Sequence, residues 1–301
     1  MVLNIKVKEI ETKTALHRLG KRMYPYNYDL NIYRGCSHKC VYCYALYSHK
    51  YFEKQGGFFD TIFVKKNILE PLEKKLSSSR WKKEVINFGG VCDSYQYIEK
   101  KYKLMPEILK LMIKYENPMI ISTKSDLILR DIDLIKELAK KTYVNVAETI
   151  TCMDEGLRKK IEPYGVSSLR RFEVLKIFRE KTNAGIGVHC MPILPFLTDN
   201  QESLEALIKK TKEINAHYMI TSGLNLIGDT KKHYYDFLKK EFPDLVSKYH
   251  QLFTNTQIKK GYNSKLYPLI KKLKYKYKVS SDYQKVIKEK LKVKDQLKMF
   301  E

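Results

Sequence analysis

Residues 34–44 read RGCSHKCVYCY and carry three cysteines in the spacing C-x3-C-x2-C. The loop is so short that the thiols of Cys36, Cys40 and Cys43 must curl around one centre. Gly35 precedes the first of them and supplies backbone freedom at the end of a predicted strand. The chain has six cysteines in 301 residues, which is too few for a disulfide framework. The clustering therefore indicates metal or redox chemistry.

The number of thiols suggests which metal centre is bound. A [4Fe–4S] cluster normally takes four thiolates, but this loop offers three, and the next cysteine in the sequence is Cys92. Three ligands leave one iron open to a small chelating molecule, such as the amine and carboxylate of S-adenosylmethionine (SAM). An electron from the cluster can then break the bond between the sulfonium and C5′ and give a 5′-deoxyadenosyl radical. The cofactor supplies this chemistry, and the protein positions and shields it.

Structural zinc is the alternative for the same loop. Zinc sites usually combine separated C-x2-4-C pairs and need four ligands. His38 lies inside the loop and could compete, although its neighbours leave it little room. The spacing favours the cluster over zinc.

Short β-rich runs alternate with longer helical patterns through the middle of the chain. This alternation predicts parallel βαβ units, as in a partial (β/α)6 barrel or an open doubly wound sheet. Asp60 opens an extra strand over 60–66, and Asp131 precedes a helix as an N-cap should. The predicted strands are 30–33, 85–88, 119–122, 144–150, 186–191 and 218–222, and the main predicted helices are 44–54, 104–115, 132–140, 169–181 and 201–214.

The composition is that of a globular protein, with 44% hydrophobic and 30% charged residues. No apolar run is long enough to span a bilayer, and the first residues carry no apolar secretory segment. We therefore expect a cytoplasmic protein without a membrane segment. The formal charge of +23 favours polyanionic partners such as nucleic acid. An excess of lysine that only solvates helix faces would give the same charge.

The composition shifts near residue 255. Residues 255–301 hold fourteen lysines, no arginine and four acidic residues, a net charge of +10. We therefore divide the chain into a core, 1–254, and a basic, mostly helical extension, 255–301, packed on the core. Within the extension, residues 271–278 read KKLKYKYK. This alternation can stack bases and neutralise phosphates, or it can protect an exposed strand edge.

The cysteine loop resembles a known family. C-x3-C-x2-C with an aromatic residue before the last cysteine is the radical-SAM signature, and LNIYRGCSHKCVYCYA (30–45) is similar to the branch of spore photoproduct lyase, also described as DNA-repair-photolyase-like. The resemblance covers about residues 3–255. It continues in INFGGVCDSYQYIE (86–99), NPMIISTKSDLILRDIDLI (117–135), NVAETITCMDEGLRKKIEP (145–163), GVHCMPILPFLTD (187–199) and HYYDFLKKEFPDLVSKYHQLF (233–253).

The resemblance implies a partial barrel with a [4Fe–4S] cluster and SAM at its mouth. Cys36, Cys40 and Cys43 would ligate the cluster, and Tyr42 would lie beside the adenine. Each remaining candidate follows a predicted strand, at the barrel end where α/β barrels place their sites. These candidates are Gly89 and Gly90 for the methionyl amine, Lys124 for the SAM carboxylate, and Thr149 or Thr151 for the ribose or the methionyl group.

Each position also has an ordinary structural explanation. Gly89 and Gly90 can form a tight turn, Lys124 can be a solvated lysine, Thr149 can be an ordinary strand residue, and Tyr42 can serve packing. The acidic residue that usually follows the two glycines is replaced here by Val91.

Cys92, Cys152 and Cys190 fall near predicted strand ends in the same half of the barrel. Spore photoproduct lyases use a cysteine near the end of the second strand as a hydrogen donor, so Cys92 is the candidate for that role. A buried free cysteine that acts as a small hydrophobe is the common alternative.

The function expected from the resemblance is a radical SAM enzyme with an external electron donor of the ferredoxin or flavodoxin type. Its substrate would be a nucleic-acid lesion, as in lyase-type DNA repair. The alternatives are radical chemistry on a peptide, a small molecule or an RNA base, and a non-catalytic Fe–S or nucleic-acid-binding protein. A basic extension that lines the barrel mouth would favour nucleic acid, and one on the far side would favour the other substrates.

Overall fold

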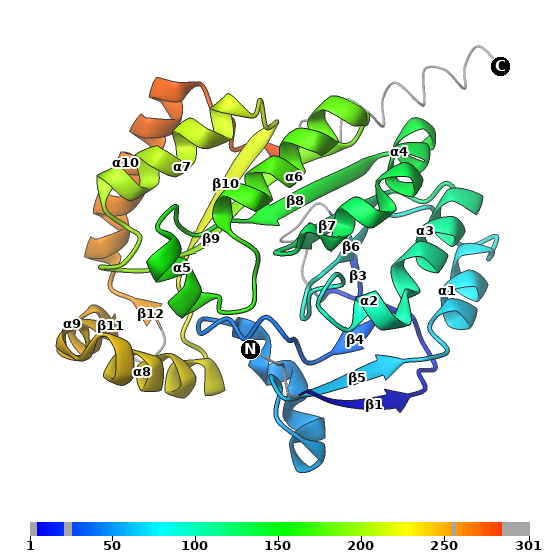
Figure 1. Ribbon diagram of the computed structural model, residues 1–301, viewed down its shortest axis with the longest axis horizontal. Helices are drawn as coiled ribbons and strands as arrows, with labels where there is room; N and C mark the ends of the chain where they lie inside the picture. The colour runs from blue at the N-terminus through cyan, green and yellow to red at the C-terminus, as the bar shows by residue number, and fades with distance from the viewer. Residues whose placement is uncertain (1–4, 21–25, 255–256, 285–301) are drawn as a thin grey trace.

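A computed structural model describes residues 5–20, 26–254 and 257–284. Its main sheet has six parallel strands whose order in space is their order in the chain (Figure 1). A doubly wound sheet would reverse that order partway, so the expected partial (β/α)6 barrel is confirmed. The strands are β3 (Tyr28–Leu30), β6 (Ile86–Phe88), β7 (Met119–Thr123), β8 (Val144–Thr149), β9 (Gly185–Ile193) and β10 (Tyr218–Gly223), and β2 (Leu16–Arg18) lies antiparallel beside β3.

The crossover helices cover the outer face of the sheet (Figure 1). Each has an apolar stripe at helical spacing, and in α3 that stripe includes Met105, Ile108, Leu109 and Met112, all fully buried. Burial of these stripes against the strands forms the main core. The helices are α1 (Leu69–Leu76), α3 (Leu104–Lys114), α4 (Ile132–Lys141), α6 (Ser168–Lys181) and α7 (Gln201–Glu213), with the short α2 (Glu99–Tyr102) and α5 (Glu155–Ile161) between them.

The first predicted strand, 30–33, is divided in the structure. β3 ends at Leu30, and β4 (Tyr33–Arg34) belongs to a second sheet with β5 (Thr61–Lys65) and β1 (Lys6–Ile10). Asn31 separates the two strands because its side chain accepts a hydrogen bond from Val91 N and its carbonyl accepts one from Lys65 Nζ. The predicted extra strand at 60–66 is confirmed as β5.

Two local predictions need correction. The segment predicted as a helix at 44–54 is the 3-10 helix η1 (Tyr44–Gln55). Asp131, which ends the 3-10 helix η2 (Asp126–Asp131), does not cap α4 through its side chain. Its carboxylate instead accepts hydrogen bonds from Arg130 and from the hydroxyl of Tyr95 (3.0 Å). A charged partner next in the chain outcompetes the backbone amides of the helix.

The C-terminal part of the described chain is helical. It comprises α8 (Asp229–Glu241), η3 (Pro243–Leu245), α9 (Val246–Leu252), the hairpin of β11 (Phe253–Thr254) and β12 (Gln257–Ile258), and α10 (Lys260–Tyr277). α10 lies against α7, where Lys276 Nζ and the Tyr277 hydroxyl both reach Glu205 (2.6 Å each). The KKLKYKYK segment is therefore helical, and the strand-edge alternative is wrong.

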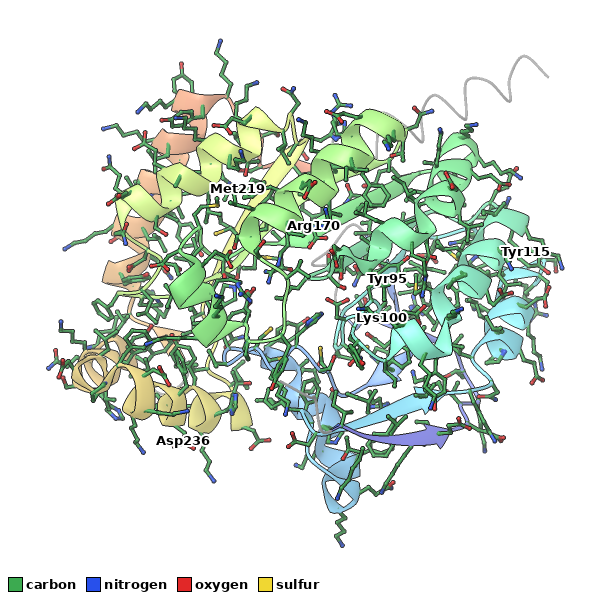
Figure 2. The ribbon with its side chains drawn as sticks, in the orientation of Figure 1. Tyr95, Lys100, Tyr115, Arg170, Met219 and Asp236 are labelled. Carbon is green, nitrogen blue, oxygen red and sulfur yellow. The ribbon has the colours of Figure 1, made fainter. Side chains whose placement is uncertain are left out.

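The chain after α10 returns to β10, the edge strand of the barrel. The amide of Met219 (Figure 2) donates to the carbonyl of Ser280 (2.8 Å), and Lys274 Nζ donates to the carbonyl of Met219 (2.6 Å). The ring of Tyr283 lies 5.8 Å from that of Tyr218, the first residue of β10. The described end of the extension thus covers the amino end of the last strand. Residues 285–301 lie outside the described chain.

No helix in the described ranges is both long and apolar enough to cross a membrane.

Candidate active site

The cysteine loop, residues 35–43, lies between β4 and η1 and is held by backbone hydrogen bonds on both sides. The amide of Cys36 donates to the carbonyl of Phe58 (3.0 Å), and the amide of Val41 donates to the carbonyl of Ile161 (3.0 Å). These bonds join the loop to the segment before β5 and to the end of α5. These bonds fix the backbone of the loop at two points.

A glycine is required where the loop begins. Gly35 has φ +80°, and a Cβ at this position would lie 2.5 Å from the carbonyl oxygen of Thr61. At the other end of the loop, the Thr230 hydroxyl at the start of α8 donates to the carbonyl of Cys43 (2.9 Å). The curl expected from the spacing is thus imposed by contacts from three separate parts of the chain.

The three thiols share a buried environment. Cys36 and Cys40 are buried, and Cys43 is partly exposed. Burial raises the pKa of all three thiols, that of Cys40 to about 12. Their charges are close enough to act on one another, while Lys124 acts in the opposite direction on Cys40 and Cys43. Three thiols beside one cation are a donor set suited to an anionic iron–sulfur centre.

Among the described residues, no three His, Cys, Asp or Glu side chains converge closely enough to hold a single metal ion. A [4Fe–4S] cube binds each thiolate at a different iron, so its ligands surround a volume and do not meet at a point. His38, the possible competitor inside the loop, is engaged elsewhere through both ring nitrogens. The residues present therefore fit a cluster held by the three cysteines.

Lys124 follows β7 and lies beside the cysteine loop. Its Nζ is 5.9 Å from the centroid of the Tyr42 ring. Burial lowers the pKa of Lys124, but the Cys40 thiol and the Glu162 carboxylate outweigh burial and raise it above its ordinary value. Lys124 therefore carries a positive charge next to the thiols, where it could bind a carboxylate.

Glu162 and Arg171 form a fully buried ion pair behind the site, which the sequence analysis missed. Glu162 accepts hydrogen bonds from the Tyr42 hydroxyl, from Arg171 and from the Thr151 hydroxyl (3.0 Å). Arg171 also donates to the carbonyl of Thr149 (2.7 Å). The pair brings together three residues that the resemblance assigns to SAM. Nothing in the local sequence marks it, because Glu162 follows α5 and Arg171 lies within α6.

The two glycines after β6 lie against neighbouring strands. Gly89 has φ +90°, and a Cβ there would lie 2.6 Å from the carbonyl oxygen of Ser122. A Cβ on Gly90 would lie 2.5 Å from Asp29 Oδ2. The Tyr44 hydroxyl donates to the carbonyl of Gly90. The turn therefore requires bare backbone at both glycines. Through the Gly90 carbonyl it also contacts Tyr44, the residue that follows the third cysteine.

Asp93 is a second residue that the sequence analysis missed. One carboxylate oxygen accepts from His38 Nε2 (3.0 Å) and from the amide of Lys124 (2.8 Å). The other accepts from the Thr123 hydroxyl (2.8 Å) and from the amide of Tyr95 (2.8 Å). Asp93 thus ties the cysteine loop to the end of β7. The absence of an acid at 91 was the available signal, since the carboxylate stands two positions later.

We expect Asp93→Asn to lower the free energy of unfolding by about 2 kcal/mol at neutral pH. Burial raises the pKa of Asp93, but His38 and the hydrogen bonds outweigh it and hold the pKa at about 2. The group therefore stabilises the fold above the unfolded pKa near 4, and this contribution is lost as the pH falls towards 2. Thermal unfolding of both proteins from pH 7 to pH 3 measures the difference. A difference that stayed constant over this range would contradict the assignment.

The other three cysteines belong to different segments of the fold, which are the turn after β6, the segment after β8, and β9. The Cys92 thiol donates to the carbonyl of Tyr33 (3.2 Å), and burial raises its pKa to about 12. The Cys152 thiol donates to the carbonyl of Asp154 (3.5 Å). Cys190 is buried in β9. Cys92 is the one that lies two residues after Gly90.

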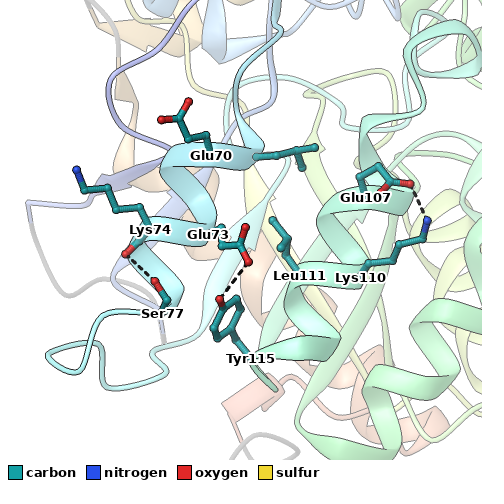
Figure 3. A pocket seen from close by; sticks show the side chains of 9 residues that line it. Glu70, Glu73, Lys74, Ser77, Glu107, Lys110, Leu111 and Tyr115 are labelled. Atoms are coloured by element: carbon teal, nitrogen blue, oxygen red, sulfur yellow. Dashed lines mark hydrogen bonds and ion pairs between the residues drawn. The ribbon is translucent and has the colours of Figure 1, made fainter.

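A surface hollow lies between α1 and α3 (Figure 3). Lys110 pairs there with Glu107 (2.7 Å), and Glu73 accepts a hydrogen bond from the Tyr115 hydroxyl (3.1 Å). It lies among the outer helices and includes no residue of the cysteine loop.

The sequence and fold can be compared with those of known proteins. The family model of the Radical SAM superfamily matches residues 30–210. An uncharacterized protein of Mycobacterium tuberculosis is 32% identical over 285 residues, which are 93% of this chain and 83% of that protein. An uncharacterized protein of Methanocaldococcus jannaschii is 31% identical over 273 residues, which are 90% of this chain and 96% of that protein.

Among solved structures, spore photoproduct lyase complexed with dinucleoside spore photoproduct matches with a TM-score of 0.66. The match covers 90% of this chain and 79% of that chain, at 12% sequence identity. A variant of the same enzyme with bound AdoMet and the dinucleoside matches with a TM-score of 0.65 at 11% identity. At this identity the match shows a shared fold.

Proposed function

Because this chain belongs to the radical SAM superfamily, we propose that it is an enzyme that cleaves SAM reductively at a [4Fe–4S] cluster held by Cys36, Cys40 and Cys43. The observation that carries the proposal is the set of three buried thiols on one anchored loop, with Lys124 beside them. When bound, the cluster and SAM supply a 5′-deoxyadenosyl radical that abstracts a hydrogen atom from the substrate.

The residues around the thiols have distinct tasks in this proposal. The ammonium of Lys124 binds the SAM carboxylate, and the bare backbone at Gly89 and Gly90 meets the methionyl amine. Tyr42 lies beside the adenine, with its hydroxyl held by Glu162. Of the two threonine candidates, the contacts favour Thr149 for SAM.

The reason lies in the hydrogen bonds of the two threonines. The Thr151 hydroxyl is already committed to Glu162. Thr149 pairs in register with His189 on β9. Residues that pair in register and share the same side of a sheet point towards the same space, so the Thr149 side chain is placed level with His189.

An external one-electron donor, of the ferredoxin or flavodoxin type, would reduce the cluster. The single cysteine motif of the chain is assigned to the cluster that binds SAM, so the electron must come from a partner.

For the substrate we propose a nucleic-acid lesion. Support comes from the fold shared with spore photoproduct lyase and from the net charge of +23. A damaged base within a duplex would have to be flipped out to reach the barrel mouth. Binding through phosphates would weaken steeply as the salt concentration rises.

A second candidate, radical chemistry on a peptide, a small molecule or an RNA base, is favoured by one observation. The described part of the basic extension packs against α7 and covers the amino end of β10. The cysteine loop lies at the carboxyl ends of the strands. The described part of the extension, residues 257–284, therefore gives no support to a nucleic-acid groove at the mouth.

Anaerobic assays separate these possibilities. The reconstituted protein with dithionite and SAM should form 5′-deoxyadenosine, and its absence would overturn the enzyme proposal. Addition of the dinucleoside spore photoproduct should yield repaired dinucleoside. Formation of 5′-deoxyadenosine without repair, and without salt-dependent binding of damaged DNA, would favour the second candidate.

Cys92 is the proposed hydrogen donor to the substrate radical. Its pKa of about 12 keeps the sulfur as S–H at neutral pH, which is the form that can donate a hydrogen atom. We expect Cys92→Ala to retain SAM cleavage but to lower the yield of the repaired product at least tenfold. The yield is measured by chromatography, with Cys190→Ala as the matched buried-cysteine control. Unchanged product and turnover in Cys92→Ala would remove the donor role.

A further inference from the structure

A chain of hydrogen bonds crosses the inside of the barrel between four neighbouring strands. Ser122 Oγ on β7 lies 3.2 Å from His189 Nδ1 on β9. His189 Nε2 lies 3.2 Å from the hydroxyl of Tyr218 on β10. Asn145 Nδ2 on β8 donates to the same hydroxyl (2.8 Å). The proposed chemistry of the cysteine loop uses none of these four side chains.

The chain borders the proposed SAM site. His189 pairs in register with Thr149, and Lys124 directly follows the strand that contains Ser122. The carbonyl of Ser122 is the atom that a Cβ on Gly89 would strike. Ser122 therefore stands between the glycine turn and His189, and it is partly exposed, whereas His189 is buried.

Tyr218 stands in the same register row of the sheet as Ser122, through Gly187 and Ala147. A Cβ on Gly187, its partner in the β9–β10 register, would collide with the ring of Tyr218. The ring thus takes the place of a side chain at 187. On β8, the residue that pairs with both Ser122 and Gly187 is Ala147, which has only a methyl group.

The direction of the hydrogen bonds follows from counting hydrogens. The Tyr218 hydroxyl accepts from Asn145, so its own hydrogen is directed to His189 Nε2. Burial, together with Lys124, lowers the pKa of His189 to about 3, so the ring is neutral and carries its hydrogen on Nδ1. That hydrogen points to Ser122 Oγ. The hydroxyl hydrogen of Ser122 is then free to point into the barrel.

We propose that the Ser122 hydroxyl donates a hydrogen bond to a carbonyl oxygen of the substrate base, and that His189, Tyr218 and Asn145 are positioning residues that fix its direction. This inference rests on the proposed function. The ligand group is uncharged because all four side chains of the network are uncharged and the nearby cation Lys124 is assigned to the SAM carboxylate; a charged group without a counter-charge at this depth would be costly. A nucleobase carbonyl meets this requirement, since it is a neutral acceptor.

The test measures binding of the dinucleoside spore photoproduct to the cluster-loaded enzyme in the presence of SAM. We expect Ser122→Ala to raise the dissociation constant about tenfold, because a buried substrate carbonyl loses its hydrogen-bond donor. We expect Tyr218→Phe to raise the dissociation constant severalfold, because His189 loses the hydroxyl hydrogen that sets its tautomer. The double variant should bind no more weakly than Ser122→Ala, since both changes remove the same interaction.

The controls separate this positioning role from a structural one. Tyr143→Phe removes the hydroxyl of another buried barrel tyrosine and should leave binding unchanged. The affinity for SAM and the unfolding temperature should also be unchanged in Ser122→Ala. Full additivity in the double variant, or a loss confined to SAM affinity, would overturn the assignment.

The wild-type enzyme tests the proposed nucleic-acid substrate, and the Ser122→Ala variant tests the role of Ser122. If the wild-type enzyme does not bind the dinucleoside, the nucleic-acid substrate is overturned and this assignment falls with it. If the wild type binds and Ser122→Ala binds equally well, only the role of Ser122 is overturned.

Discussion

Replacement of Cys40 by alanine is expected to abolish the reductive cleavage of SAM. The loop supplies three thiolates for a [4Fe–4S] cube, and removal of one leaves two irons without protein ligands. The rate of 5′-deoxyadenosine formation should fall below about 1% of the wild-type rate, a loss of about 2.7 kcal/mol or more of transition-state stabilisation. Anaerobic reconstitution, iron analysis and chromatography of the product measure this effect.

Cys190→Ala is the matched control for Cys40→Ala, because Cys190 is also buried but lies in β9. It should bind about four irons per chain and retain cleavage. The apoprotein of Cys40→Ala should unfold at the same temperature as the wild-type apoprotein, since the backbone bonds from Cys36 and Val41 hold the loop. Normal iron content and normal cleavage in Cys40→Ala would refute the cluster assignment.

Arg171→Met is expected to cause the largest loss of stability of any single substitution considered for this protein. Both partners of the Arg171–Glu162 pair are fully buried, and the substitution leaves the Glu162 charge without its counter-ion. The fold should lose about 3–5 kcal/mol, which corresponds to a fall of about 10 °C in the unfolding temperature. Tyr42 depends on the same carboxylate, so SAM affinity should fall as well.

Arg170→Met is the control from the neighbouring position (Figure 2). Arg170 is partly exposed and pairs with Asp126 and Glu173 at the surface, so its loss should cost less than about 1 kcal/mol. The double variant Arg171→Met/Glu162→Gln should recover part of the stability, because no buried charge remains unpaired. Equal unfolding temperatures for Arg171→Met and Arg170→Met would show that the buried pair does not stabilise the fold.

Strand alternation allowed the barrel to be predicted because buried parallel strands are short apolar runs separated by amphipathic helices. Five of the six strands lie within a few residues of their predicted positions. The first strand was misjudged because Asn31 bonds to Val91 and Lys65, which are distant in sequence. Asp131 was misassigned as a cap for a similar reason, since its carboxylate is used by Arg130 and Tyr95.

Contacts between residues that are distant in sequence also limited prediction of the candidate site. The cysteine motif is readable because its residues are neighbours in the chain and their spacing follows from the geometry of one cluster. Asp93 was missed because its four partners come from the cysteine loop, the end of β7 and its own turn. Glu162 and Arg171 were missed because a buried carboxylate looks like a surface one until its environment is known.

The sequence alone establishes the cysteine motif, the paired glycines and the alternation of strands and helices, because each is a pattern of neighbouring residues. The network from Ser122 to Asn145, the ion pair behind Tyr42 and the position of the basic extension are different in kind. Each depends on which strands lie side by side and which side chains lose water, and folding alone decides both.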